Sequence, residues 1–189
     1  MTTEQSTPSD LTQLSGTYTL DPAHTEIGFT ARHAMVTKVR GSFTAFEGTG
    51  VVDTSDFSRS TVSLSIDAKS IDTRNEQRDG HLRSNDFLSM DEYPTITFTS
   101  TEVEQTGPTT VDLTGDLTIK GVTNSITVPF EFQGAATDPF GNPRVGFEGS
   151  TTINRKDYGI TWNAPLETGG VLVSDKVTLQ FDISAIKSA

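Results

Sequence analysis

Apolar and polar residues alternate along most of the chain, and this alternation predicts many short β-strands. In a strand, residues two apart share a face, so alternation marks one buried face and one exposed face. Short alternating runs occur around Tyr18 and Leu20 and around Gly41 and Phe43. The longer series that share a face are Ile27, Phe29, Ala31 and His33; Val62, Leu64 and Ile66; Ile96 and Phe98; Val111, Leu113, Gly115, Leu117 and Ile119; Ile126, Val128, Phe130 and Phe132; Val145, Phe147, Gly149 and Ile153; and Val177, Leu179, Phe181 and Ile183.

Threonine and serine fill much of the opposite face of these strands, which favours an antiparallel sheet. Parallel sheets are covered on both faces and read as continuous apolar runs, which this chain lacks. The residues between Ile119 and Ile126 predict a hairpin turn, and loops are expected at 134–143 and around Gly169. A β-sandwich and a β-barrel both fit this pattern.

One segment, 70–88, breaks the alternation and predicts a short helix around residues 72–84. It is rich in charged residues and has Asp72 and Thr73 as candidate N-caps, although Gly80 weakens a helix interior. Three arginines, Arg74, Arg78 and Arg83, lie within it, although the protein as a whole is acidic.

Length and charge limit the classes of protein to which the chain can belong. Its 189 residues suit one domain, expected over 14–187, after a polar tail over 1–13 that we expect to be disordered. The 25 acidic and 14 basic residues give a net charge of -11, which argues against nucleic acid as a partner. The same charge disfavours docking to anionic lipid by charge alone.

Cysteine is absent, which excludes disulfides, thiolate metal sites and a cysteine nucleophile. No run approaches the roughly 20 apolar residues that cross a bilayer, so we expect a soluble protein. The first residues, 1–14, lack the charged start and apolar stretch of a secretory signal, and a cytoplasmic location is therefore the expectation.

Several spaced motifs occur in order along residues 16 to 184. They are Leu20-Asp21-Pro22-Ala23-His24-Thr25 with Phe29 and His33; Arg78-Asp79-Gly80-His81-Leu82-Arg83-Ser84 with Asp86-Phe87; Tyr93-Pro94 with Ile96-Thr97-Phe98; Gly115 to Thr123; Ile153-Asn154-Arg155 with Asp157-Tyr158-Gly159-Ile160; and Asp175-Lys176-Val177. Together they resemble the YceI family of polyisoprenoid-binding proteins. Tyr18 stands where members often have Trp, and many relatives carry an export signal.

This resemblance implies an all-β fold, an extended eight-stranded antiparallel lipocalin-like barrel that holds one lipid. The implied ligand is a polyisoprenoid, an isoprenoid quinone or a similar long amphiphile, with no other cofactor. It also implies a homodimer, and a lipid carrier is compatible with transient contact with a membrane. Other lipophilic molecules, such as antibiotics or fatty amides, fit the same kind of cavity.

The chain has eleven phenylalanines, and the faces that the alternation assigns to the interior carry almost no charge. Such faces suit a dry, hydrocarbon-binding cavity, while a solid core packed by the same rings is the structural alternative. The residues expected to line the cavity are Phe29, Phe43, Phe98, Phe130, Phe132, Phe147, Ile160 and Trp162.

Arg78, His81 and Arg83 are the candidates for contact with a polar head group, because guanidinium groups pair with phosphate oxygens. The alternative is an internal network in which these arginines pair with Asp79 and Asp86 and fix the helix across the barrel mouth. Both interpretations fit the sequence.

His33 shares a face with Ile27 and Phe29, so it is expected to point inward, either as a satisfied core histidine or as a hydrogen-bond partner of the ligand. His24 is expected in a turn at the start of a strand. The residues Asn154, Arg155 and Asp157 are expected to lock a loop.

An enzyme is the competing class of function. His81 with Asp79 or Asp86 could form a general base and the group that orients it. However, no serine elbow, phosphate-binding glycine loop or HExxH motif occurs, and the histidine spacing fits no familiar metal site. Binding without catalysis is therefore the prediction.

Overall fold

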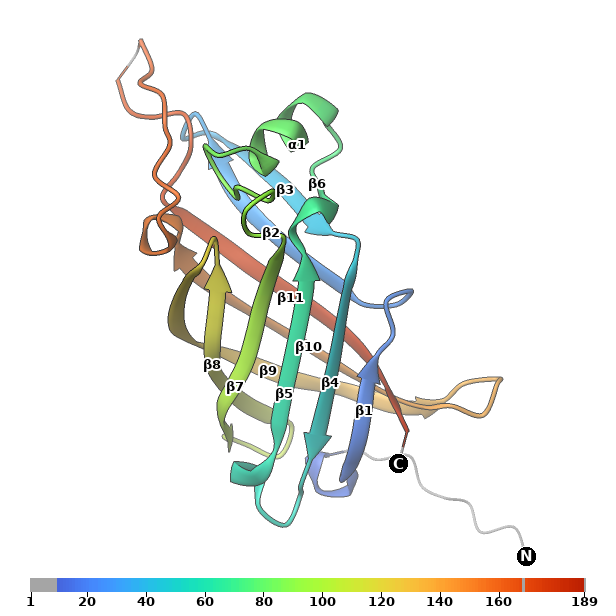
Figure 1. Cartoon of the computed structure of the whole chain (residues 1–189). Helices are drawn as coiled ribbons and strands as arrows, with labels where there is room; N and C mark the ends of the chain where they lie inside the picture. The colour runs from blue at the N-terminus through green and yellow to red at the C-terminus, as the bar shows by residue number, and fades with distance from the viewer. Residues whose placement is uncertain (1–9, 168, 189) are drawn as a thin grey trace, which may run out of the picture.

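The computed structural model describes residues 10–167 and 169–188, and strands make up most of it (Figure 1). Besides the strands it contains one α-helix, α1 (Glu76–Arg83), and short 3-10 helices at Leu11–Gln13, Phe57–Arg59, Ala68–Ser70 and Arg155–Tyr158. The strands are β1 (Gly16–Leu20), β2 (Glu26–His33), β3 (Thr37–Phe43), β4 (Phe46–Val52), β5 (Thr61–Asp67), β6 (Ile71–Asp72), β7 (Thr95–Gln105), β8 (Thr110–Ile119), β9 (Val122–Thr137), β10 (Pro143–Asn154) and β11 (Lys176–Lys187).

Eight strands close into a barrel in the order β1-β4-β5-β7-β8-β9-β10-β11, with every pairing antiparallel. Pairing between β11 and β1, such as Leu20 with Ala185, completes the ring. The closed antiparallel barrel implied by the resemblance is therefore confirmed, and the sandwich alternative is wrong.

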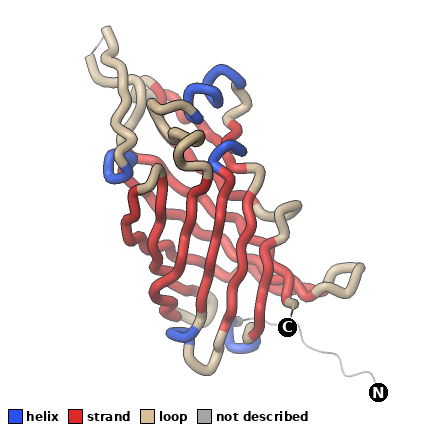
Figure 2. The backbone as a smooth tube through the Cα atoms, viewed as in Figure 1, coloured by secondary structure: helices blue, strands red, loops and turns tan. Residues whose placement is uncertain are grey.

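One edge of the strand β11 pairs with β10, and its other edge pairs with two strands in succession. Its last residues pair with β1, whereas residues 178–182 pair with β2. The hairpin β2–β3 therefore extends the wall beyond the point where the ring closes, and the short strand β6 adds to its edge. Strands fill the lower part of Figure 2, and loops gather at the end where α1 lies.

The expected hairpin over 111–132 is formed by β8 and β9. Its turn places Lys120 and Gly121 at φ angles of 52° and 74°, the left-handed pair that a tight two-residue hairpin requires. The side chain of Tyr93 lies where a Cβ at Gly121 would stand, so glycine is needed at this position for space as well as for conformation.

The helix lies within the predicted segment, but its N-cap is Asn75 and not Asp72 or Thr73. The side chain of Asn75 accepts a hydrogen bond from the backbone N–H of Arg78 at 3.0 Å. Thr73 is instead buried, and Asp79 accepts hydrogen bonds from both its backbone N–H and its hydroxyl.

The folded domain begins earlier than the expected boundary at residue 14. Leu11 is 1% exposed, and it packs with Leu14, Tyr18 and Phe132 in a cluster at one end of the barrel. The expectation of a disordered tail is thus wrong for residues 10–13, because Leu11 supplies a buried side chain that packs with Leu14 at the start of the expected domain. Residues 1–9 lie outside the described residues.

Candidate functional site

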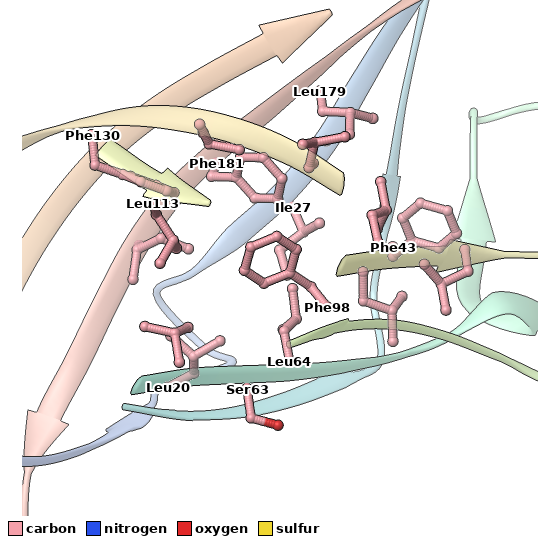
Figure 3. A pocket seen from close by; sticks show the side chains of 18 of the residues that line it. Leu20, Ile27, Phe43, Ser63, Leu64, Phe98, Leu113, Phe130, Leu179 and Phe181 are labelled. Carbon is pink, nitrogen blue, oxygen red and sulfur yellow. The ribbon is translucent and has the colours of Figure 1, made fainter. Parts of the chain in front are cut away.

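A cavity of about 350 Å³ runs through the barrel and is lined almost entirely by aliphatic and aromatic side chains (Figure 3). The alternating series supply most of this lining from several strands, which confirms which face of each strand turns inward. The lining residues include Ile27, Phe29, Val62, Leu64, Ile66, Ile96, Phe98, Val111, Leu113, Leu117, Ile126, Val128, Phe130, Val145, Phe147, Leu179, Phe181 and Ile183.

Most of the residues predicted to line the interior do border this cavity, and the alternative of a solid barrel is wrong. The residues that border it are Phe29, Phe43, Phe98, Phe130, Phe147 and Ile160. Phe132 does not, because it is buried against Phe147, with ring centroids 5.5 Å apart. Trp162 packs instead on His81 and Phe87.

Three phenylalanine rings leave room in the cavity by lying over glycines on the adjacent strand. Phe29 covers Gly41, Phe98 covers Gly115, and a Cβ at Gly149 would stand 2.6 Å from a ring carbon of Phe130. Any larger residue at these glycines would push a ring toward the centre of the barrel.

An aromatic group covers the end of the barrel near α1. The ring of His81 meets Trp162 at 4.7 Å and Phe87 at 5.0 Å, both edge-on. Phe87 also lines the cavity, together with Leu82 and Leu88. These three were missed by the sequence analysis, because they come from a helix and loop where no strand alternation marks the inward face.

The two arginines predicted to contact a head group hold the backbone of the preceding segment. Arg78 donates to the hydroxyl and to the carbonyl of Thr73, each at 2.7 Å. Arg83 donates to the carbonyls of Lys69 and Ile71 at 2.9 and 3.1 Å. The internal network is therefore present, but its acceptors are carbonyl and hydroxyl oxygens and not Asp79 or Asp86.

Arg78, His81 and Arg83 all lie outside the cavity lining. The two arginines donate to backbone carbonyl and hydroxyl oxygens beside the helix, and these acceptors come within reach only in the folded chain. The cavity end beside α1 is formed by apolar groups.

His33 does not point into the barrel as expected. It is exposed and pairs with Val173 in an isolated bridge near the end of β2. Alternation correctly assigns this face of β2 to the interior, since Ala31 lines the cavity. His33 is on the same face but lies beyond the part of the barrel that encloses the cavity.

The pair of His81 and Asp79 proposed for an enzyme does not form. The buried Asp79 carboxylate accepts hydrogen bonds from Thr73, while the His81 Nε2 atom lies 2.8 Å from Asp86 on the outside of the helix. The His81–Asp86 pair is half-exposed and borders no part of the cavity.

Arg155 locks the loop that leads from β10 to β11, as predicted for this segment. Its guanidinium is buried and donates to the carbonyls of Ile160, Trp162, Val173 and Ser174 at 2.8 to 3.3 Å. Burial lowers the pKa of this guanidinium.

Tyr158 is a buried polar residue beside the cavity that the sequence analysis did not single out. It is 1% exposed, and within the described ranges its hydroxyl has no hydrogen-bond partner. Burial raises the pKa of this phenol, so the hydroxyl is a neutral donor at physiological pH.

Two kinds of feature are absent from the described residues. No helix is long and apolar enough to cross a membrane. No group of three or more His, Cys, Asp or Glu side chains is arranged to hold a metal ion.

Comparison with known proteins identifies the family. Residues 18–185 match the profile of the YceI-like domain. The chain belongs to the YceI-like family. The UPF0312 protein SAS2572 of Staphylococcus aureus strain MSSA476 is 42% identical to this YceI-like chain, and the alignment covers 89% of the chain and 95% of that relative.

Solved structures share the fold of this YceI-like barrel at lower identity. BcnA of Burkholderia cenocepacia superposes with a TM-score of 0.76 at 22% identity, over 87% of this chain and 98% of that one. A polyisoprenoid binding domain from Saccharophagus degradans superposes with a TM-score of 0.68 at 18% identity, over 90% and 98%.

Proposed function

We propose that this protein binds a polyisoprenoid or an isoprenoid quinone-type lipid in the barrel interior and carries or stores it without chemical change. The observation that carries the proposal is the apolar cavity in the barrel, because its volume and apolar walls are typical of a small-molecule site. The description of the S. degradans neighbour as a polyisoprenoid binding domain agrees with it.

The energetics favour reversible binding. Each methylene removed from water contributes about 0.8 kcal/mol, so a chain of several isoprene units is held firmly against release into solution. A membrane is nearly as apolar as the cavity, so the net preference between the two is small. A barrel of this kind therefore suits exchange with a membrane.

Uptake by the purified protein tests the proposal. Native mass spectrometry followed by organic extraction identifies a co-purified lipid. The delipidated protein is then offered a polyprenyl phosphate, an isoprenoid quinone and a fatty amide in competition. We expect the first two to bind; preference for the fatty amide would instead favour sequestration of other lipophiles, and no uptake of any of them contradicts the proposal.

A matched pair of tryptophan variants ties uptake to the cavity. Ile126 lines the cavity, while its neighbour Ser125 is exposed on the same strand. Ile126→Trp should block uptake, and Ser125→Trp should leave it unchanged. Equal uptake by both variants would place the ligand elsewhere.

The homodimer implied by the resemblance stays a prediction. Light scattering coupled to size-exclusion chromatography, with and without bound lipid, tests it.

A further inference from the structure

The turn between β2 and β3 exposes two apolar side chains at the α1 end of the barrel. Met35 is 61% exposed and Val36 is 75% exposed. Val171, in the loop before β11, is exposed beside them, and the Ala34 N–H of the turn donates to the Leu172 carbonyl of this loop at 2.8 Å. We call Met35, Val36 and Val171 the apolar tip; both segments lie at the upper left of Figure 1.

The backbone of this turn is strained in a way that stability does not explain. Ala34 and Met35 have φ angles of 51° and 66°, in the left-handed region. Tight hairpin turns with two such residues strongly prefer Asn-Gly, because other side chains clash with the backbone there. An exposed apolar turn kept in a costly conformation points to a function for its side chains.

Four cations lie on the outer face of the wall next to the apolar tip. Arg32 on β2 is paired with Lys38 on β3, Arg40 follows on the same face, and Lys176 begins the adjacent β11. All four are exposed, and none is within 4.0 Å of a carboxylate oxygen in the part of the chain that the structure describes. We call these four residues the basic collar.

Four acidic residues of the same outer face form a row far from the tip, whereas the exposed Asp72 on β6 is opposite Ser42 of β3 and accepts a hydrogen bond from the Arg74 backbone N–H. Glu131, Glu148, Asp182 and Glu26 are opposite one another in register across β9, β10, β11 and β2. Glu26 and Arg32 are six residues apart on one strand, or about 20 Å. This exceeds the Debye length of about 8 Å in physiological salt, so the row barely affects the potential at the collar. Glu167 is an exposed acidic residue in the loop beside the tip.

The cavity extends to the base of the apolar tip. Ala31 on β2 and Val173 in the loop before β11 both line it, and His33 bridges to Val173 just below the turn. The other end of the cavity is closed by Leu11 and Leu14. The exposed apolar side chains and the basic residues are thus at the same end of the barrel as one end of the cavity.

We propose that the apolar tip and the basic collar dock on the surface of an anionic phospholipid bilayer. Exposed apolar side chains enter the interfacial region, and the adjacent lysine and arginine side chains meet lipid phosphates. The contact brings the near end of the cavity to the membrane. A role in lipid loading rests on the proposed function, whereas docking alone does not depend on it.

Flotation with vesicles tests the docking. The full chain is mixed with vesicles of phosphatidylcholine alone or with equimolar phosphatidylglycerol. We expect binding to the anionic vesicles that weakens as salt is raised. Met35→Ser/Val36→Ser should lower the apparent affinity by about tenfold or more. Phe140→Ser is the matched control, because Phe140 is 88% exposed in the β9–β10 loop, away from the tip, and its loss should have no effect.

A second pair of variants tests the charge. Lys38→Gln/Arg40→Gln removes two collar cations and should weaken binding about 25-fold, or about fivefold for each charge near the surface. Arg59→Gln/Lys187→Gln makes the same change in net charge elsewhere on the molecule and should leave binding nearly unchanged. Equal losses from both pairs contradict a localised docking site.

Two outcomes overturn the proposal. One is that the wild-type chain does not float with anionic vesicles. The other is that Met35→Ser/Val36→Ser converts a dimer into a monomer without changing vesicle binding, in which case a second copy covers the tip. Uptake of detergent-solubilised lipid, measured in parallel, separates the two proposals. The tip variants should still take up this lipid. If neither the wild type nor any variant takes it up, the cavity function is contradicted and the docking proposal is unaffected.

Discussion

At the scale of single residues, glycines set the width of the cavity. Three inward-facing phenylalanines have a glycine close by on the paired strand, and each ring lies over that glycine. The pair of Phe29 and Gly41 is the clearest case, because the groups nearest to an added Cβ at Gly41 are the Phe29 ring and the Thr73 methyl, with no backbone atom among them.

Gly41→Ala should therefore push the Phe29 ring into the cavity. We expect a destabilisation of about 1–3 kcal/mol, typical of overpacking, together with weaker lipid uptake. Chemical denaturation and the uptake assay measure the two effects. Gly41→Ala/Phe29→Leu should recover both, because the smaller side chain vacates the space.

Gly50→Ala is the control for this prediction. Gly50 also lines the cavity, but the nearest atom to an added Cβ is 3.6 Å away, an ordinary contact. A loss of stability in this variant equal to that of Gly41→Ala would show that the position of the ring is not the cause.

At the scale of elements, one arginine joins the β9–β10 hairpin to the β1–β2 turn. Arg144 donates to Asp138 at 2.7 Å and to Asp21 at 2.5 Å, and His24 lies 2.6 Å from the same Asp21 carboxylate. Hydrogen bonds from Arg144 and then from His24 lower the pKa of Asp21 to about 2. The backbone N–H of Asn142, followed by Arg144, lowers the pKa of Asp138.

This network should make the barrel sensitive to acid. An unfolded aspartate has a pKa of about 4, so the lowered pKa stabilises the folded state in full above pH of about 4. The stabilisation is then lost as the pH falls from there through about 2. Arg144→Gln should be less stable than wild type at neutral pH and should show a shallower loss between those pH values in thermal unfolding.

Arg59→Gln is a control for the acid prediction, since Arg59 is exposed and its Asp56 partner is 3.6 Å away. Its acid profile should follow that of the wild type. An unchanged acid slope in Arg144→Gln would contradict the assignment of this network as the cause.

At the scale of the whole molecule, the net charge is distributed unevenly over the barrel. Four exposed carboxylates are opposite one another across four adjacent strands, and like charges in direct cross-strand pairs destabilise a sheet. We expect Glu148→Lys to stabilise the barrel by about 1 kcal/mol, since lysine would face Glu131 and Asp182. The gain should shrink as salt is added.

Glu47→Lys provides the matched change in net charge. Glu47 is paired with the neutral Ser65 on β5, so this variant should gain little. If denaturation midpoints rise equally for both variants, then the overall charge of -11, and not the row, governs stability.

The sequence by itself determined the antiparallel strands and which of their faces turn inward, because alternation is a local consequence of the strand period. It also located the helix segment and the loop locked by Arg155. Closure of the sheet into a barrel was not fixed by alternation, which fits a sandwich equally well; the family resemblance supplied it, and the pairing of β11 with β1 established it.

Only the tertiary structure decided where the side chains of the site end up. Arg78 and Arg83 turn to carbonyls that come near them only on folding, and His33 extends past the enclosed part of the wall although it shares a face with Phe29. The width of the cavity depends on which glycine faces which ring across two strands. Alternation fixes the face on which a residue lies, whereas strand register, closure of the wall and competition for hydrogen-bond partners fix what that residue touches.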